Sequence, residues 1–377
     1  MIDWYQQWRG EVEQRRQERE RRRLERPLQD RRYFGEETWG ASAEHLKAET
    51  DEPCLQHLYL PLLRSEKELA AWLGIPLTRL RWFTRDQPAD TVWHYVAHSV
   101  PKRSGGQRLI LAPKRDLKAL QRHVLHHLLN HVSVTEMAHG FVAGRSIISN
   151  AQPHVGKEIV LNFDLADFFP SITFPRVRGL FLSLGYSFSV ASVLALLCTE
   201  HEREAFDHDG TRYFISVGPR HLVQGAPTSP TLANLAAARL DRRLAGLGRV
   251  QGFAYTRYAD DLTFSGDEVA GAYWLLKSVP PIVREEGFVI HEGKTRLFRQ
   301  SARQVVTGLV VNEQLGTPRE LRRRVRAILH KAHQTGLEAQ NHDGHADFRA
   351  YLQGLIGFIH EANPAQAAPL RAALAAL

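Results

Sequence analysis

The stretch that decides the fold is FAYTRYADDLTFS, residues 253–265. It places two adjacent carboxylates, Asp260 and Asp261, between two short runs of aromatic and β-branched residues. Such runs around a short polar segment predict a β-hairpin with an acidic tip. Because two neighbouring like charges repel each other, a fold that presents them together favours a bound cation. A polar hairpin turn is the simpler interpretation of the dipeptide alone, since Asp is a common turn residue.

A third carboxylate in a matching context favours the cation site. The segment EIVLNFDLADFFPSI, residues 158–172, begins with a short apolar run that ends at Asp164. A buried strand is a rigid element on which to place a metal ligand. We therefore expect Asp164 and the Asp260-Asp261 pair to face each other across a sheet. Together they would form an oxygen-only site suited to two Mg²⁺ ions.

Six segments, in order over about residues 90–312, resemble the motifs of reverse transcriptases. The two acidic segments resemble the catalytic motifs of that family. SVPKRSGGQRLI (99–110) resembles the fingers segment that grips the triphosphate, and QGAPTSP (224–230) the motif that shapes the nucleotide pocket. GKT (293–295) resembles the lysine motif, and VTGLVVN (306–312) the primer grip.

The resemblance implies the fold class and the domain organisation. It implies an α+β right-hand polymerase, with fingers, a palm built on an antiparallel sheet, and a helical thumb. Fingers and palm would occupy residues 41–312 and the thumb residues 313–377. Residues 1–40 would be a charged helical extension, because residues 11–26 contain seven arginines and five glutamates. That extension is either a solvated helix or an arm for RNA or a partner protein.

The resemblance also implies roles for single residues. Asp164 and Asp260 would hold both Mg²⁺ ions, for which Mn²⁺ is a substitute, with the Leu165 carbonyl as a further ligand and Asp261 as support. The nucleotide-binding residues would be Lys102, Arg108, Phe169, Gln224, Gly225 and Lys294.

Two further elements are similar to those of bacterial retron reverse transcriptases: NAQPH (150–154) and VTG (306–308). The Pro in the first predicts an extended path or turn. Asn150 and His154 would bind RNA there, or would only satisfy the backbone groups of their own loop. Thr307 and Gly308 would lie near the duplex. On the basic segment after residue 318 the phosphate-binding candidates are Arg322, Arg323 and Arg326.

Membership of the retron group would imply the substrate and the partners. The enzyme would copy its own structured noncoding RNA into DNA from deoxynucleoside triphosphates. It would prime from the 2′-hydroxyl of an internal guanosine and remain bound to its RNA and cDNA. A role in antiphage defence, with a separate effector protein, is also implied. The alternatives are a group II intron or abortive-infection reverse transcriptase, and a scaffold that binds RNA and an effector. DNA joined to co-purified RNA would distinguish them.

Composition agrees with a partner that carries negative charge. The net charge is +8 and the isoelectric point about 9.6, which favours polyanions without specifying one. The two cysteines, Cys54 and Cys198, have no metal-binding spacing. No apolar run approaches the roughly 20 residues that span a bilayer. The amino terminus has no apolar signal core, so we expect a cytoplasmic protein without a membrane partner.

Local signals predict several element boundaries. Asp209-Gly210 predicts a hairpin turn, and Ser229-Pro230 predicts the N-cap and first residue of one helix toward Leu247. Pro280-Pro281 should end a helix. Thr317 to Glu320 reads as a capping box with Pro at the first helical position. His123, His127 and His131 recur at helical spacing, and a solvated or RNA-facing side is favoured over zinc because no Cys or acid accompanies them.

Overall fold

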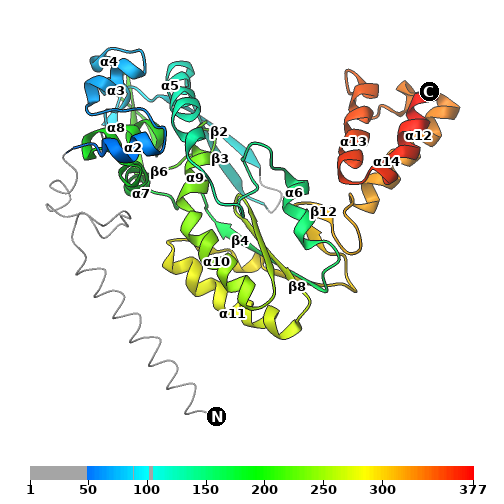
Figure 1. Cartoon of the computed structure of the whole chain (residues 1–377). Coiled ribbons are helices and arrows are strands. Elements are labelled where there is room, and N and C mark those ends of the chain that lie inside the picture. Colours follow the sequence, from blue (N-terminus) through cyan, green and yellow to red (C-terminus); the bar gives the residue numbers. More distant parts are fainter. Residues whose placement is uncertain (1–48, 88, 102–104) are drawn as a thin grey trace, which may run out of the picture. The chain divides into compact units, whose positions relative to one another are not determined.

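The computed structural model describes residues 49–87, 89–101 and 105–377 (Figure 1). The predicted charged extension over residues 1–40 and the side chain of Lys102 lie outside these residues. The chain divides into two compact units. The first holds the described residues up to His131 together with Thr173–Pro227, and the second holds Val132–Ile172 and Thr228–Leu377.

The first unit combines short helices with two small antiparallel sheets. One sheet has the order β1-β6-β5, and the other is the pair β2-β3. The strands are β1 (Ala89–Asp90), β2 (Tyr95–Pro101), β3 (Gln107–Pro113), β5 (Glu200–His208) and β6 (Thr211–His221). The helices are α2 (Glu52–His57), α3 (Glu66–Trp72), α4 (Leu77–Phe83), α5 (Arg115–His127), η3 (Leu129–His131), α7 (Phe174–Ser183) and α8 (Phe188–Cys198).

Sequence signals explain how these elements start and turn. The Ser65 side chain caps α3 by accepting from the Glu68 amide. The predicted hairpin turn at Asp209-Gly210 is confirmed, because it joins β5 to β6 with both residues at positive φ. Helix α8 is apolar on most sides and is buried along most of its length.

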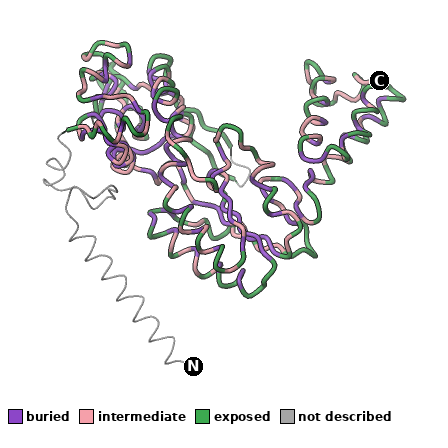
Figure 2. Tube along the Cα trace, in the orientation of Figure 1, coloured by how far each residue is buried: buried purple, intermediate pink, exposed green. Residues whose placement is uncertain are grey.

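A five-stranded sheet is the centre of the second unit. Its order is β10-β4-β8-β7, and β9 also pairs with β4. The strands are β4 (Ile159–Ala166), β7 (Ala254–Tyr258), β8 (Asp261–Gly266), β9 (Val289–Ile290) and β10 (Arg296–Arg299). Figure 2 shows that burial is concentrated along β4 and β8. The apolar runs that lead to Asp164 and follow Asp261 are therefore the middle strands β4 and β8, and the run before Asp260 is the edge strand β7.

The two faces of the sheet carry different side chains, because alternate residues of a strand point to opposite sides. Tyr255 and Arg257 of β7 face α10 (Ala238–Val250), which contacts β7 and also packs on α11 (Val269–Glu285). Thr256 and Ser265 lie on the opposite face, where they contact His154. Smaller elements complete this unit: α6 (Ile147–Ala151), η4 (Gln152–His154), α9 (Ser229–Ala236), η5 (Glu292–Lys294), β11 (Val305–Val306) and β12 (Leu309–Val310).

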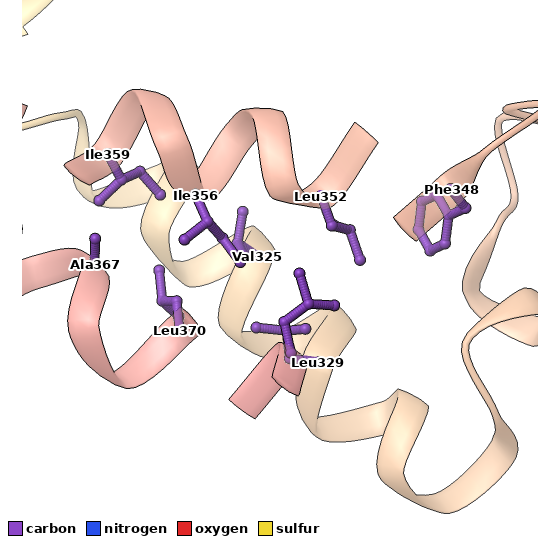
Figure 3. Packing of buried hydrophobic residues seen from close by; sticks show 9 residues of the cluster. Val325, Leu329, Phe348, Leu352, Ile356, Ile359, Ala367 and Leu370 are labelled. Carbon is purple, nitrogen blue, oxygen red and sulfur yellow. The ribbon is translucent and has the colours of Figure 1, made fainter. Parts of the chain in front are cut away.

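Three helices at the carboxyl end enclose a hydrophobic cluster of their own (Figure 3). They are α12 (Arg319–Thr335), α13 (Phe348–Ala362) and α14 (Pro364–Ala375), with the short η6 (Glu338–Gln340) after α12. Val325, Leu329, Leu352, Ile356 and Ile359 are almost fully buried in this cluster. Their helical spacing places one apolar side of each helix toward the others, as the sequence pattern predicts.

Four local predictions are wrong. Helix α11 continues through Pro280 and Pro281 to Glu285, and the burial of Val279 and Val283 holds its apolar side against the sheet. Pro318 is the N-cap of α12 without a side-chain cap bond, so there is no capping box. The helix after Pro227 starts with Thr228 as its N-cap and divides at Ala237 into α9 and α10. NAQPH is helical, since α6 passes directly into η4. Pro153 fits there because it lies in the first turn of η4, where its missing amide costs nothing.

Candidate active site

The three carboxylates meet where β4 pairs with the β7–β8 hairpin. Asp164 and Asp261 are direct partners in the antiparallel register of β4 and β8, so their side chains lie on the same face. Asp260 lies in the two-residue turn between Tyr258 and Asp261. The Leu165 amide donates to the Asp260 carbonyl at 2.9 Å and ties this turn to β4. The expectation that Asp164 faces the acidic hairpin is confirmed for Asp261, its direct partner in the register.

Negative charge is concentrated around Asp261. The pKa of the Asp261 carboxyl is raised to about 7, first by burial and then by the negative charges of Asp260 and Asp164. The Lys294 ammonium acts in the opposite direction, and its Nζ lies 2.8 Å from Asp164 Oδ1. Lys294 reaches this position because η5 follows β9, which pairs with β4 just beyond Asp164. For Asp261, the Lys294 ammonium offsets the effect of burial and of the two neighbouring carboxylates only in part.

The carboxylate oxygens fit a hard divalent cation, although the side chains are not arranged to surround one. Within the described part of the chain, no group of three or more His, Cys, Asp or Glu side chains is arranged as a ready metal site. Carboxylate oxygens are nevertheless the ligands that such cations prefer. A cation beside Asp261 would relieve the repulsion that raises the pKa of this group.

A fully buried ion pair supports the carboxylate hairpin from behind. Arg257 Nε lies 2.7 Å from Asp241 Oδ1, and Arg257 Nη2 lies 2.8 Å from Asp241 Oδ2, with neither side chain exposed. Arg257 Nη1 also donates to the Ala259 carbonyl at 3.1 Å and to Asn234 Oδ1 at 3.0 Å. The Tyr255 hydroxyl donates to the same Asp241 carboxylate. Helices α9 and α10 therefore hold the turn that carries Asp260.

A neighbouring segment packs directly on this turn. Ala138 forms a parallel bridge with Arg257, and Gly140 follows it. A Cβ on Gly140 would lie 2.7 Å from the Ala259 nitrogen, so this position requires glycine. Ala259 itself has a φ of +56°, a conformation that disfavours side chains. The acidic turn is thus held in a strained shape by close packing.

Comparison with known proteins identifies the family. Residues 100–322 match the family described as "Reverse transcriptase (RNA-dependent DNA polymerase)". The retron Mx65 reverse transcriptase of Myxococcus xanthus is 50% identical over 317 residues, which cover 84% of this chain and 73% of that protein. The chain belongs to the retron reverse transcriptases. This reverse transcriptase is an RNA-directed DNA polymerase, and its family, with the mixed helices and sheets of both units, confirms the predicted α+β right-hand polymerase class.

Two further similarities accompany this match. The retron Ec86 reverse transcriptase of Escherichia coli is 36% identical over 281 residues, covering 73% of this chain and 80% of that protein. A foamy viral protease-reverse transcriptase solved with double-stranded DNA has a TM-score of 0.39 and 17% identity, and the match covers 76% of this chain and 44% of that one. No helix in the described part of the reverse transcriptase is long and apolar enough to cross a membrane.

The predicted nucleotide-binding residues are divided between the two units. Lys102 lies outside the described residues, whereas Arg108 is exposed on β3 of the first unit. The Gln224 carbonyl accepts from the Leu111 amide of the same strand at 2.8 Å. Gly225 has a φ of +118°, and a Cβ there would lie 2.7 Å from the Leu111 carbonyl oxygen. Within the first unit, the structure therefore brings Gln224 and Gly225 onto the strand that carries Arg108.

Phe169 lies in the second unit, in the turn that follows β4. Its ring centroid is 5.6 Å from that of Phe168 and 6.3 Å from that of Phe141. Phe168 is buried, whereas Phe169 is only half-buried. The more exposed of the two adjacent phenylalanines is thus the one predicted to contact nucleotide.

The two retron elements contact each other. The Thr307 hydroxyl donates to the Ile147 carbonyl at 3.2 Å, and the Asn150 amide lies 3.5 Å from the same hydroxyl. Thr307 and Gly308 form the turn between β11 and β12, both at positive φ. Asn150 is buried, so this side chain joins α6 to the turn, and only the turn itself is left to approach RNA.

The RNA-binding assignment of His154 requires correction. The side chain is fully buried, with Nδ1 2.6 Å from the Ser265 hydroxyl and Nε2 2.8 Å from that of Thr256. Both ring nitrogens are used inside the protein, so neither is presented to RNA. The alternative weighed from the sequence, that His154 satisfies backbone groups of its own loop, is not what these contacts show either, because both partners are side-chain hydroxyls of β7 and β8. His154 fastens η4 to β7 and β8 on the sheet face that also carries Asp164 and Asp261.

His154 predicts a specific loss of stability in acid. Burial, together with the nearby charge of His139, lowers the pKa of this imidazole from 6.5 to about 3. Between these values the unfolded chain binds a proton that the folded chain excludes, so the contribution of His154 is complete above pH 6.5 and is lost as the pH falls. From pH 6.5 to about 4.5, wild type should lose about 2 kcal/mol more unfolding free energy than His154→Gln, measured with denaturant. Parallel pH profiles would contradict this assignment.

The predicted thumb cations lie on α12 in different surroundings. Arg323 and Arg326 are exposed one turn apart, whereas Arg322 is half-buried. Arg324, between them, pairs with Asp343 at 2.9 Å. Arg323 and Arg326 are therefore the better placed for phosphate contact.

Sequence reasoning missed the residues that support the hairpin. Arg257 stands inside the quoted stretch as the one charged residue of its strand, and Asp241 lies on the buried side of its helix with Leu240 and Leu244. A charge on an apolar side needs a partner, so these two positions were an available signal. No such signal marked Gly140, because its constraint comes from a turn more than one hundred positions away.

Proposed function

We propose that this reverse transcriptase copies part of its own structured noncoding RNA into single-stranded DNA, primed from the 2′-hydroxyl of an internal guanosine. The observation that carries the catalytic part is the direct pairing of Asp164 with Asp261 beside Lys294. Similarity to the Mx65 and Ec86 retron reverse transcriptases supports the retron assignment, from which the substrate and the priming mode are proposed. The bound partners would be the cognate RNA, its cDNA and deoxynucleoside triphosphates.

The carboxylates would hold two Mg²⁺ ions, with Mn²⁺ as a substitute. Asp164 and Asp260 would be the principal ligands, with the Leu165 carbonyl and Asp261 in support. Bound there, the ions would lower the pKa of the attacking hydroxyl and neutralise charge on the pyrophosphate. The protein residues position this chemistry: Arg257 holds the turn that carries Asp260, and β4 fixes Asp164 opposite Asp261.

Other side chains would bind the substrates. Lys102 and Arg108 would contact the triphosphate, Arg with a planar fork and Lys as a point charge. Gln224 and Gly225 would line the nucleotide pocket beside β3. Lys294, whose ammonium already lies against Asp164, would neutralise or protonate the departing pyrophosphate. The thumb arginines, and the Thr307-Gly308 turn, would contact the RNA backbone without reading its sequence.

Phe169 supplies a testable part of this proposal. Placed five residues after Asp164 and half-exposed, its ring would lie under the deoxyribose and exclude a 2′-hydroxyl. Phe169→Val should raise ribonucleotide incorporation relative to deoxyribonucleotide by about 10-fold or more, since a steric contact of this size is worth about 1–3 kcal/mol. Competition between the two nucleotides on one template measures the ratio, with Phe206→Val, exposed on β5, as a control. Unchanged discrimination in an active variant would return Phe169 to a packing role.

The biological role proposed is antiphage defence. A separate effector protein would be held inactive by the complex of enzyme, RNA and DNA. The cytoplasmic location predicted from the sequence belongs to this proposal. Co-purification of the enzyme with an RNA that carries covalently joined DNA is the test of substrate and priming. An enzyme that extends annealed primers but leaves its co-purified RNA free of DNA would retain only the polymerase assignment.

A further inference from the structure

Phe141 is a large apolar side chain kept in an unfavourable position. Its side chain is 52% exposed, and its backbone has a φ of +61°. This exposure leaves about half of the side chain in water, and the left-handed conformation is disfavoured for any residue with a Cβ. Neither feature helps the folded protein, and Gly or a small polar residue would suit the same turn better.

The backbone around Phe141 is fixed to the acidic hairpin. The His139 amide donates to the Arg257 carbonyl at 2.8 Å, and the Asn234 amide donates to the Gly140 carbonyl at 2.9 Å. Gly140 packs so closely on Ala259 that no side chain fits between them. Phe141, the next residue, is therefore held at a fixed position relative to the turn that carries Asp260.

The ring of Phe141 lies beside two aromatic rings of the candidate active site. Its centroid is 6.3 Å from that of Phe169 and 6.4 Å from that of Tyr258. Tyr258 comes two residues before Asp260, and Phe169 follows β4, the strand that carries Asp164. Three aromatic side chains from three separate segments thus gather next to the carboxylates.

We infer that Phe141 is a substrate-contacting residue, whose ring packs against a base or a deoxyribose of the nucleic acid at the polymerase site. This inference rests on the proposed function. The ring has no hydrogen-bonding group, so it suits the flat faces of bases and sugars and does not suit phosphates. The base or deoxyribose that the ring contacts can belong to the incoming nucleotide or to the terminal base pair of the template–primer duplex. Both present the same flat apolar faces to the ring.

The test compares Phe141→Ala and Phe141→Trp with wild type on an annealed DNA primer and a generic RNA template. Loss of an aromatic–base contact should lower kcat/KM about 10-fold to 100-fold in the alanine variant, and tryptophan should restore most of it. The thermal midpoint of Phe141→Ala should be unchanged or higher, because an exposed ring is removed. Tyr59→Ala is the matched control, since Tyr59 is 88% exposed with a φ of +54° in the first unit.

Two measurements identify the contacted group: the KM for the nucleotide and the affinity for the template–primer duplex. A raised KM for the nucleotide with unchanged duplex affinity identifies the incoming nucleotide. Weaker binding of a fluorescent template–primer, measured by anisotropy without catalysis, identifies the duplex. Wild-type kinetics and wild-type affinity in Phe141→Ala would overturn the inference, as would a loss that follows a lowered thermal midpoint and is not restored by tryptophan. A wild-type enzyme that binds the duplex but does not extend it would instead contradict the proposed function.

Discussion

Replacing both Asp260 and Asp261 by asparagine is expected to abolish DNA synthesis while the protein stays folded. Each carboxylate supplies negative charge where the metal ions would be held, and loss of one such electrostatic contribution typically costs about 10²-fold to 10³-fold in rate. Stability should not fall, because burial and neighbouring negative charges already raise the pKa of Asp261 to about 7. The asparagines remove that repulsion.

Primer extension on an RNA template measures the effect, and thermal unfolding of the same preparation measures stability. Asp267→Asn is the matched control, because Asp267 lies on the same sheet unit but is exposed and paired with Lys157. Its activity should equal that of wild type. DNA synthesis at a near wild-type rate by the double variant would refute the assignment of the carboxylates.

Breaking the Arg257–Asp241 pair is expected to give the largest loss of stability. Both side chains are fully buried, so Asp241→Leu leaves the Arg257 guanidinium without its carboxylate in a site that water does not reach. Removing one partner of such a pair typically costs about 3–5 kcal/mol. The same change frees the Ala259 carbonyl from a fixed donor, so activity per folded molecule should fall as well.

The double variant Arg257→Met with Asp241→Leu separates these two effects. Without a buried unpaired charge it should recover most of the unfolding free energy, measured with denaturant. Its activity should stay low, because nothing replaces the bond to Ala259. The exposed Lys157–Asp267 pair is the control, and its removal should cost less than about 1 kcal/mol. Full activity in the double variant would show that the pair contributes to stability alone.

The strands were predictable because local patterns specify them, and the apolar runs before Asp164 and around Asp260 are long enough to indicate strands. The pairing of Asp164 with Asp261 joins two distant segments and was expected because both carry carboxylates in matching contexts. The Asp209-Gly210 turn was predictable because its backbone needs positive φ at both residues. The strands and this turn depend on residues close together in the chain.

The errors have a different physical origin, which is tertiary contact. Pro280 and Pro281 are tolerated inside α11 because Val279 and Val283 hold the helix on the core. His154 looked available for RNA because its loop precedes the catalytic strand. Its two partners, Thr256 and Ser265, are more than one hundred residues away and gave no local signal.

The most direct test of the account is to purify the enzyme with its bound RNA and ask whether DNA is covalently joined to that RNA. Ribonuclease treatment should leave single-stranded DNA that retains a ribonucleotide through a 2′ linkage, and the Asp260→Asn, Asp261→Asn variant should yield the same RNA without DNA. Wild-type enzyme whose bound RNA carries no DNA, while annealed primers are extended normally, would contradict the account.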